Sequence, residues 1–432
     1  MGNRRGFLKW SAAVAATPLL AKTGGAKVLP AGLPTSSALP EVLARDQAHW
    51  RAVRALYPVQ DEIINLEHGY WGKMSRSVEE AYLRHTRRVN QDLSWYARRD
   101  YERDFLAARA SVAEALGVKL NELMLTRNAT ESFVNLITQF QGLKPGDEIL
   151  WADADYPEFK KMMAWLAETR QVSGHTIKLP ASGSDEDYLQ VYRQAIEAQP
   201  KLKLMLLTHV SNQHGLTLPV RKIAALAKKR GIHVICDCAQ SWGLLDFRLD
   251  DLGVDWAVFN LHKWIGSPVG VGALYMREGT LGAVQPFPGA AASDADVSSR
   301  VHMATANFAA FLTVPEALAF HQAIGGANKE ARLRYLRESW VEPLGDIEGV
   351  EILGAASAEN ATGMGGLRLR GRTSKADAEE LQSRLQHQFG VFTVVRDGLA
   401  SGACVRVTPQ VFSSVREVEV FVEAVEEIAA TS

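Results

Sequence analysis

Apolar and polar residues follow two different rhythms along most of this 432-residue chain. From residue 122 onward, short apolar runs such as LKLMLL and HVIC are separated by segments with the apolar period of an amphipathic helix. Several of these runs end in polar residues, as in MLTRNATES, EILWADADYPEF and WAVFNLHKW. Strands that alternate with helices predict an α/β protein with a mainly parallel sheet covered by helices on both faces.

The segments on either side of this region follow other patterns. Residues 27–40 are rich in Pro, Ser and Gly and predict a linker, and residues 41–56 have a helical rhythm. Residues 78–116 predict long helical structure and hold SWYARRDYERDF, which could line a substrate mouth, form a solvated helix face or make a subunit contact. Residues 281–305 predict loops and residues 314–340 a long helical segment.

The C-terminal part predicts a smaller α+β unit. Its strands are expected in EGVEILG, GGLRLRG, VFTVV and ACVRVTP, and its helices over residues 375–389 and 415–430. The chain is therefore divided into residues 1–26, a linker and helical segment 27–60, a large domain 61–310 and a small domain 311–432.

Residues 3–9 read NRRGFLK and precede an apolar run over residues 10–20. This order resembles a twin-arginine export signal, although a frayed basic terminus would have a similar composition. The apolar run is too short to span a bilayer. We therefore expect the twin-arginine translocase to export the protein to the periplasm or out of the cell, with cleavage near residues 13–16 or residue 26.

Composition excludes several other classes of protein. The chain is 47% hydrophobic and 22% charged, as in soluble globular proteins. Its net charge of −1 does not show the excess of basic residues that is typical of nucleic-acid-binding proteins. Cys236, Cys238 and Cys404 make neither a disulfide framework nor a metal-binding pattern. Because Cys236 and Cys238 flank Asp237 in one strand, we expect them on opposite faces and unable to bridge.

Lys263 is the first candidate catalytic residue. It lies at the end of an apolar strand in VFNLHKWIGSPVGVG, where partial burial lowers the pKa of an amine and makes it a nucleophile. Such a lysine can form a Schiff base with pyridoxal phosphate, whereas most lysines are only surface charges. Since carboxyl ends of parallel strands meet at one edge, other strand-end residues should join it. No GxGxxG follows the first strand, which disfavours a dinucleotide fold.

With these motifs in this order, the chain resembles the class V aminotransferase family of fold-type I pyridoxal phosphate enzymes. The resemblance covers about residues 60–430, and the branch that includes isopenicillin N epimerase fits best. It implies a large domain with a mainly parallel, seven-stranded type of sheet and a small α+β C-terminal domain. It also implies a pyridoxal phosphate cofactor and a homodimer with shared active sites.

The resemblance assigns roles around the cofactor ring. Lys263 would bind the cofactor, and Asp237 in ICDCAQ would hold the pyridine nitrogen protonated. Gln240 and Asn212 would contact the phenolic oxygen, and Tyr156 in DADYPEF would stack on the ring. The simpler alternatives are a capping or ion-paired aspartate, an asparagine in a turn and a tyrosine packed in an ordinary loop.

Other matching residues would bind the phosphate. Ala129 and Thr130 in RNATES lie at a helix start, where N–H groups favour anions, although Thr130 could simply cap the helix. His262 and Asn260 would complete this cup, Asn260 standing where the family usually has serine. Thr305 in HMATANF would reach the phosphate of the neighbouring subunit, but alanine replaces the glycine that usually precedes it.

The resemblance also implies the substrate class. Arg406 in ACVRVTPQVF would bind a substrate α-carboxylate, unless it is a surface charge on a strand. We thus expect an exported transaminase or epimerase acting on the α carbon or side chain of an amino acid or amino-acid-containing metabolite. Tailoring of a siderophore such as pyoverdine would fit the export signal.

Two alternatives remain for the function: a C–S lyase and a non-catalytic binding protein with the same fold. The presence of Lys263, Asp237 and Arg406 together argues against a non-catalytic protein. A cysteine desulfurase is not expected, because that chemistry needs a cysteine on a mobile loop and the three cysteines here lie in predicted strands.

Overall fold

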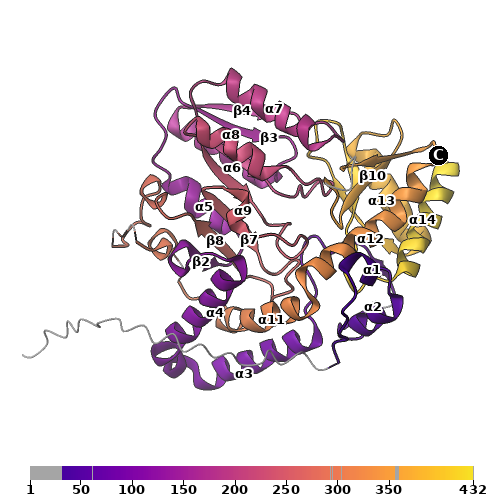
Figure 1. Ribbon diagram of the computed structural model, residues 1–432, viewed down its shortest axis with the longest axis horizontal. Helices are drawn as coiled ribbons and strands as arrows, with labels where there is room; N and C mark the ends of the chain where they lie inside the picture. The colour runs from indigo at the N-terminus through magenta and orange to yellow at the C-terminus, as the bar shows by residue number, and fades with distance from the viewer. Residues whose placement is uncertain are drawn as a thin grey trace, which may run out of the picture.

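The computed structural model describes residues 32–60, 62–291, 293, 295–302, 304–355 and 360–431 (Figure 1). The expected export signal and its cleavage points lie outside the described residues. 

A seven-stranded sheet forms the centre of the larger part of the molecule, in the order β2-β8-β7-β6-β5-β3-β4. Its neighbouring strands pair in parallel except where β8 meets β2 and β7, so the predicted mainly parallel sheet is confirmed. The strands are β2 Leu123–Thr126, β3 Glu148–Ala152, β4 Ser173–Ile177, β5 Leu202–Thr208, β6 His233–Asp237, β7 Trp256–Asn260 and β8 Gly272–Met276.

Apolar side chains on both faces of this sheet are buried, as expected for parallel strands covered on both sides. In β5, Leu204 and Leu206 belong to one apolar cluster, whereas Met205 and Leu207 belong to another, because successive side chains point to opposite faces. The covering helices around this sheet are α5 Ala129–Gln139, α6 Pro157–Arg170, α7 Asp185–Ala198, α8 Val220–Lys229 and α9 Leu249–Leu252.

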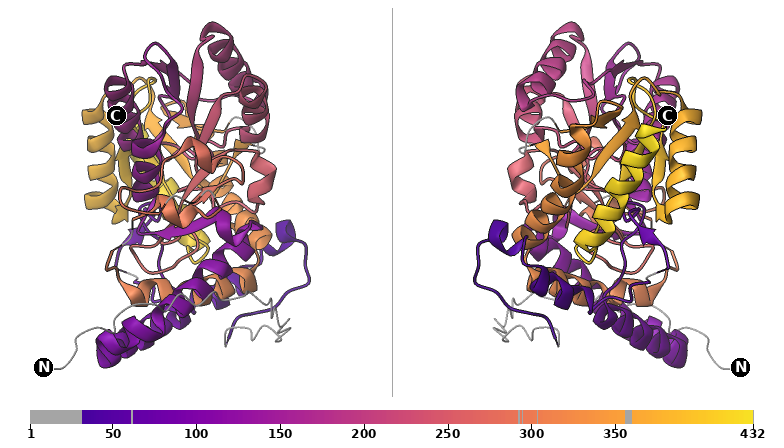
Figure 2. Two further views of the ribbon diagram at one scale, coloured as in Figure 1. Left: turned by 90° about the vertical axis from the view of Figure 1, so that its left-hand side faces the viewer. Right: turned by 90° about the vertical axis from the view of Figure 1, so that its right-hand side faces the viewer.

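The helices of the N-terminal segment are interrupted at more places than the apolar pattern of the sequence predicts. Instead of one helix over residues 41–56, α1 Pro40–Leu43 and α2 Gln47–Arg54 are separated at Asp46, which caps α2 by accepting from the N–H groups of Ala48 and His49. The long helical region consists of α3 Arg76–Arg99, interrupted at Leu93, and α4 Tyr101–Leu116. Figure 2 shows α3 extending along one end of the molecule.

The smaller C-terminal part has its own four-stranded antiparallel sheet, in the order β12-β13-β10-β9. Its elements are β9 Val350–Leu353, β10 Gly365–Leu369, α13 Lys375–Phe389, β11 Val391–Phe392, β12 Val394–Arg396, β13 Cys404–Val407 and α14 Val415–Ala430. The bounds of α13 and α14 match the expected helices, since a serine with an acid three residues later starts each one.

Strand pairing and a pair of helices join the larger part of the molecule to the C-terminal part. β1 Ile64–Asn65, which precedes the large sheet in sequence, pairs with β11 of the C-terminal part. The expected helix over residues 314–340 is two helices, α11 Val314–Ile324 and α12 Gly326–Gly345, divided at Gly325, whose φ of 92° suits glycine. α11 packs against α3 and α4, whereas α12 contacts α14 and β9.

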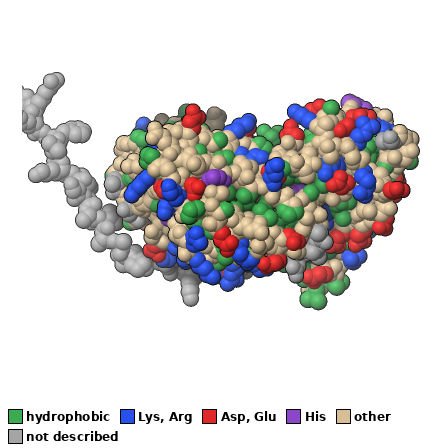
Figure 3. Space-filling model, turned by 90° about the horizontal axis from the view of Figure 1, so that it is seen from above, with side chains coloured by type: hydrophobic (Ala, Val, Ile, Leu, Met, Phe, Trp, Pro, Cys, Tyr) green, Lys and Arg blue, Asp and Glu red, His purple; other side chains and the backbone are tan. Residues whose placement is uncertain are grey.

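Shorter elements complete the fold. Within the described ranges they include α10 Phe308–Leu312 and the 3₁₀ turns Leu120–Glu122, Leu281–Ala283 and Val297–Arg300. Among the described residues, no helix combines the length and apolar character that crossing a bilayer requires. On the face seen in Figure 3, basic and acidic side chains are interspersed, in keeping with the net charge of −1.

Candidate active site

A cavity of about 420 Å³ lies at the carboxyl ends of the central strands, between the two parts of the chain. It collects residues far apart in sequence, including ten of the eleven expected at the site. These ten are Ala129, Thr130, Tyr156, Asn212, Asp237, Gln240, Asn260, His262, Lys263 and Arg406. Thr305 does not line it; this residue is exposed in the segment before α10, and its expected contact with a neighbouring subunit stays a prediction.

Lys263 follows β7 and is partly exposed to this cavity. Burial lowers the pKa of its amine to about 8, the nearby Asp237 carboxylate opposes that change, and Arg406 and Arg396 add to it. The chain passes closely over this lysine, because Gly72 donates its N–H to the carbonyl of His262 at 2.7 Å. A Cβ at position 72 would lie 1.8 Å from the carbonyl oxygen of Lys263, so glycine is required there.

Asp237 ends β6, the strand next to β7, so the pairing of the sheet places it beside the lysine. Burial raises the pKa of its carboxyl group to about 6, while a backbone N–H and the charge of Lys263 favour the ionised form. One carboxylate oxygen accepts from the N–H of Ala239 at 2.9 Å. A buried carboxylate beside a buried amine is a pair whose pKa values are tuned by each other.

The start of α5 forms another wall of the cavity. Asn128 caps the helix by accepting from the N–H of Glu131 at 2.8 Å. The side-chain oxygen of Asn260 accepts from the N–H of Ala129 at 2.9 Å, which joins the end of β7 to this helix. The amide nitrogen of Asn260 and the hydroxyl of Thr130 then lie at a helix N-terminus, where an anion is favoured.

His262 and Gln240 are held by the surrounding chain. The Nδ1 of His262 lies 3.0 Å from the carbonyl of Val271, and burial lowers the pKa of this imidazole to about 4, so the ring is neutral at pH 7. Gln240 donates to the carbonyl of Gly69 at 2.8 Å and accepts from the indole of Trp264 at 2.9 Å. One N–H of its amide is left for another acceptor.

Tyr156 precedes α6 and is half-buried at the cavity wall. Its ring packs edge-on against Phe159, with a centroid separation of 5.3 Å and an interplanar angle of 83°. This packing orients an aromatic ring at the cavity, as the expected stacking role requires.

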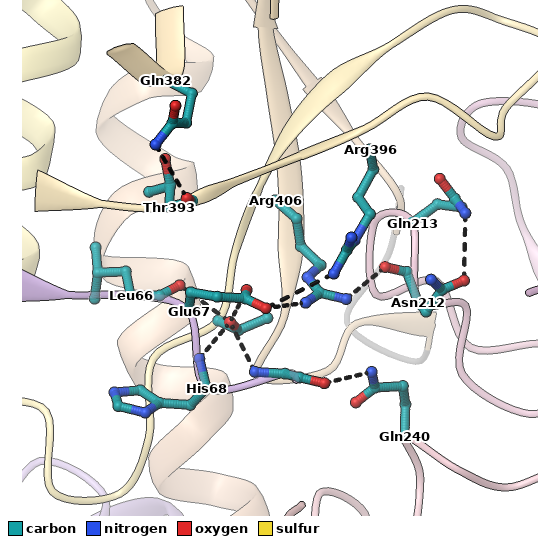
Figure 4. A network of polar contacts seen from close by, with 12 residues as sticks. Leu66, Glu67, His68, Asn212, Gln213, Gln240, Gln382, Thr393, Arg396 and Arg406 are labelled. Atoms are coloured by element: carbon teal, nitrogen blue, oxygen red, sulfur yellow. Dashed lines mark hydrogen bonds and ion pairs between the residues drawn. The ribbon is translucent and has the colours of Figure 1, made fainter. Parts of the chain in front are cut away.

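Arg406 is completely buried and already has partners. It donates to the carbonyl of Asn212 at 2.7 Å and to Glu67 at 2.5 Å (Figure 4). Arg396, from the neighbouring strand β12, points toward the same glutamate, with 3.7 Å between its Nη2 and Oε1 of Glu67. Glu67 was not a site candidate, because a lone acid before the loop HGYWGKMS carries no motif.

The loop after Glu67 also contributes to the site. Tyr70 and Trp71 line the cavity and are 64% and 53% exposed. Their aromatic character in a glycine-containing loop was the only sequence signal for such a role. Both residues also line a second cavity of about 720 Å³, together with Arg396 and Val269.

The cysteines differ from one expectation. Cys236 and Cys238 do not point to opposite faces, because their sulfur atoms lie 3.6 Å apart. Cys236 lies in β6 and Cys238 directly follows that strand, and residues two apart in an extended chain share a face, so the expected separation was wrong. All three cysteines are buried, and Cys404 lies within β13.

The chemistry of these groups fits pyridoxal phosphate. A lysine of lowered pKa suits the aldehyde, a buried carboxylate suits the pyridine nitrogen, and a helix N-terminus suits the phosphate. Among the described residues, no cluster of histidine, cysteine and acidic side chains could hold a metal ion.

Known proteins are similar to this chain in sequence and in fold. Isopenicillin N epimerase of Streptomyces clavuligerus is 26% identical over 88% of this chain and 98% of its own. A probable cysteine desulfurase of Vibrio cholerae is 25% identical over 87% of this chain and 97% of its own. A structure of the cystine C-S lyase C-DES with cysteine persulfide matches with a TM-score of 0.74 and 22% identity, over 85% of this chain and 97% of that one.

Family models account for both regions that the sequence singled out. The model for the TAT (twin-arginine translocation) pathway signal sequence matches residues 3–21, which confirms the predicted signal and supports export by that pathway. The Aminotransferase class-V model matches residues 74–419. The chain therefore belongs to the aminotransferase class-V family of pyridoxal phosphate enzymes.

Proposed function

We propose that this protein is an exported enzyme that moves a proton at the α carbon of an amino acid or an amino-acid-containing metabolite, as a transaminase or an epimerase. The observation that carries the proposal is the pairing of Lys263 and Asp237 at the ends of adjacent strands, with both pKa values displaced toward neutrality. An amine with a pKa of about 8 can both take up and release a proton at physiological pH.

Each residue then has a specific task. When bound, pyridoxal phosphate supplies an aldehyde that takes up amines and an electron sink for negative charge at the α carbon. Lys263 would hold the cofactor and, once released from it, would take the α proton and return it. Asp237 would keep the pyridine nitrogen protonated, and Tyr156 would pack against the ring.

The remaining side chains position the two ends of the cofactor. Ala129, Thr130, Asn260 and His262 would bind the phosphate, the first two through the N-terminus of α5. Gln240 and Asn212 would bind the phenolic oxygen, Gln240 with the N–H that its bonds to Gly69 and Trp264 leave over.

The export signal supports a site of action in the periplasm or outside the cell, and tailoring of a siderophore such as pyoverdine is our specific proposal for its role. The size of the second cavity, about 720 Å³, supports a substrate larger than a free amino acid. A homodimer in which Thr305 reaches the partner's phosphate completes the proposal. Sedimentation of the wild-type protein and of Thr305→Ala, with cofactor affinity as a second readout, tests this part.

A C–S lyase is the second candidate, supported by the fold that the chain shares with C-DES. Incubation with amino acids in D₂O separates the reactions. Transamination gives a keto acid, epimerisation gives the inverted amino acid with deuterium at the α carbon, and a lyase gives cysteine persulfide, pyruvate and ammonia from cystine.

The experiment that tests the role of Lys263 is the variant Lys263→Ala. Purified wild-type protein should absorb visible light, and borohydride reduction followed by peptide mapping should locate the cofactor on Lys263. The variant should lose the absorbance and the turnover, whereas Lys161→Ala, which removes an exposed lysine, should keep both. A Lys263→Ala protein that retains a covalently bound cofactor and turnover would contradict the assignment.

A further inference from the structure

The two arginines of the small domain differ in what they can still bind. Arg406 on β13 has a fully buried side chain, whereas the side chain of Arg396 on β12 is 22% exposed. Both line the cavity that contains Lys263, but Arg396 also lines the second, larger cavity. The boundary between the two cavities is therefore the place where Arg396 can meet a ligand.

Glu67 occupies the guanidinium of Arg406 from within the protein. Its Oε1 accepts from Nη2 at 2.5 Å, its Oε2 accepts from the hydroxyl of Thr408 at 3.1 Å, and only 7% of its side chain is exposed. The other terminal nitrogen of Arg406 donates to the carbonyl of Asn212. The main chain also covers this group, since a Cβ at Gly69 would lie 2.8 Å from Nη2.

An incoming carboxylate could pair with Arg406 only by displacing Glu67. That exchange would leave a buried glutamate without its cation, and an unpaired buried charge is strongly unfavourable. Arg396 is not held by a close ion pair of this kind. Its one described ion pair is the longer contact of 3.7 Å to Glu67, and 22% of its side chain is exposed, whereas the side chain of Arg406 is fully buried.

The balance of charge around Glu67 also favours binding of an acid by Arg396. Two guanidinium groups face one glutamate carboxylate, so a single positive charge is left for a ligand (Figure 4). Lys73 also lines the larger cavity, but its amine donates to the carbonyl of Pro58 at 2.7 Å. Glu79 lines that cavity as well and offsets part of the charge of Lys73.

We propose that Glu67 is a specificity-determining residue. Its carboxylate neutralises Arg406 from within the protein, so the acidic group of a substrate binds to Arg396 instead. The inference rests on the proposed function, because it concerns substrates of the same site. The substrate is then an amine that carries one acidic group at the boundary of the two cavities. The rest of that molecule lies in the larger cavity, against the exposed side chains of Tyr70, Trp71, Val269 and Phe392.

Binding of matched probes tests the role of Arg396 without any turnover. Cofactor-loaded protein is titrated calorimetrically with 3-phenylpropanoate and with its neutral analogue 3-phenylpropanamide. The acid should bind at least ten-fold more tightly than the amide. Arg396→Gln should weaken the acid about ten- to a hundred-fold and leave the amide unchanged, because a charge-assisted pair is lost. Arg396→Lys should restore part of the preference.

Lys73→Gln is the matched control, since it removes another cation from the larger cavity. It should change acid binding less than three-fold. The proposal is overturned if Arg396→Gln binds the acid as the wild type does, if the acid has no advantage over the amide, or if Lys73→Gln abolishes that advantage.

The isosteric variant Glu67→Gln tests the other half of the proposal. It frees Arg406, so acid binding should become about ten-fold tighter, and the double variant Glu67→Gln/Arg396→Gln should regain a preference for the acid. Weaker acid binding in a Glu67→Gln protein that unfolds at the wild-type temperature would overturn the role of Glu67. Loss of visible absorbance in the wild type would instead contradict the proposed function, so the two failures are distinguishable.

Discussion

At Lys263, opposing electrostatic effects set the reactivity of a single amine. Burial and two arginines disfavour its charged form, while Asp237 favours it, and burial prevails. The pKa is therefore lowered to about 8, well below the ordinary lysine value but close enough to neutrality that both protonation states are accessible.

This balance predicts the pH dependence of cofactor capture by the cofactor-free protein. A lowered pKa means that the amine is protonated and unreactive below pH 8 and neutral above it. The rate of covalent capture should rise through about pH 8 and level off above, as followed by visible absorbance in stopped flow. Asp237→Asn removes the group that favours the charged amine, so its midpoint should move to lower pH.

Pyridoxal without phosphate is the control for this measurement, since the phosphate itself titrates near pH 6. The same midpoint with both aldehydes would assign the titration to the protein. A midpoint near pH 10 in the wild type would contradict the lowered pKa of Lys263.

The cysteines predict a lack of desulfurase activity, although several relatives are named as desulfurases. Cys404 lies in a strand, and burial raises the pKa of its thiol to about 12, so it is neither mobile nor ionised at pH 7. Wild-type protein given L-cysteine should form no persulfide, and Cys404→Ser should keep its activity toward the true substrate. Sulfide release that stops in Cys404→Ser alone would refute this.

At the scale of single elements, local capping determines where several helices begin. Ser374 accepts from the N–H of Asp377 and donates to its carboxylate, which in turn accepts from the N–H of Ser374. This capping box fixes the first turn of α13, far along the chain from Lys263.

Ser374→Ala should therefore destabilise the protein by about 1 kcal/mol without affecting the site. The expected drop in the thermal unfolding midpoint is about 2 °C, with unchanged visible absorbance and turnover. Ser374→Thr, which keeps a capping hydroxyl, is the control. A loss of cofactor affinity in Ser374→Ala would mean that α13 influences the site more directly than its contacts indicate.

At the scale of the whole molecule, the site depends on both parts of the chain. The large sheet and the loop after β7 supply Asp237 and Lys263, the C-terminal sheet supplies Arg396 and Arg406, and the N-terminal segment supplies Glu67. Because β1 pairs with β11, this N-terminal segment is attached to the C-terminal part of the molecule. Relative movement of the two parts would therefore carry Glu67 together with the arginines.

Export is also a property of the whole molecule, because twin-arginine systems carry folded proteins. Replacing Arg4 and Arg5 by lysine should leave folded protein with visible absorbance in the cytoplasm, since the matched signal depends on the arginine pair. Cell fractionation with absorbance measurement checks this, and Lys9→Arg serves as the matched control. Variant protein that still reaches the periplasm would show that another signal directs export.

The sequence by itself determined the elements whose signals are local. The apolar runs that lead to Asp237 and Lys263 are strands, and the capping sequences of α13 and α14 place those helices correctly. β4 was not predicted, because SGHTI is a largely exposed edge strand with little apolar alternation. Likewise, the break at Gly325 was not anticipated within a continuous apolar rhythm.

The tertiary structure alone decided how charges from distant segments are paired. Lys263, Asp237 and Arg406 were recognisable because each belongs to a motif in or shortly after an apolar strand. That Glu67 neutralises Arg406 could not be predicted, since 339 positions separate the two residues and no local pattern links them. Pairing of β1 with β11 and of β12 with β13 brings them together, so specificity here is set by contacts that only the folded chain creates.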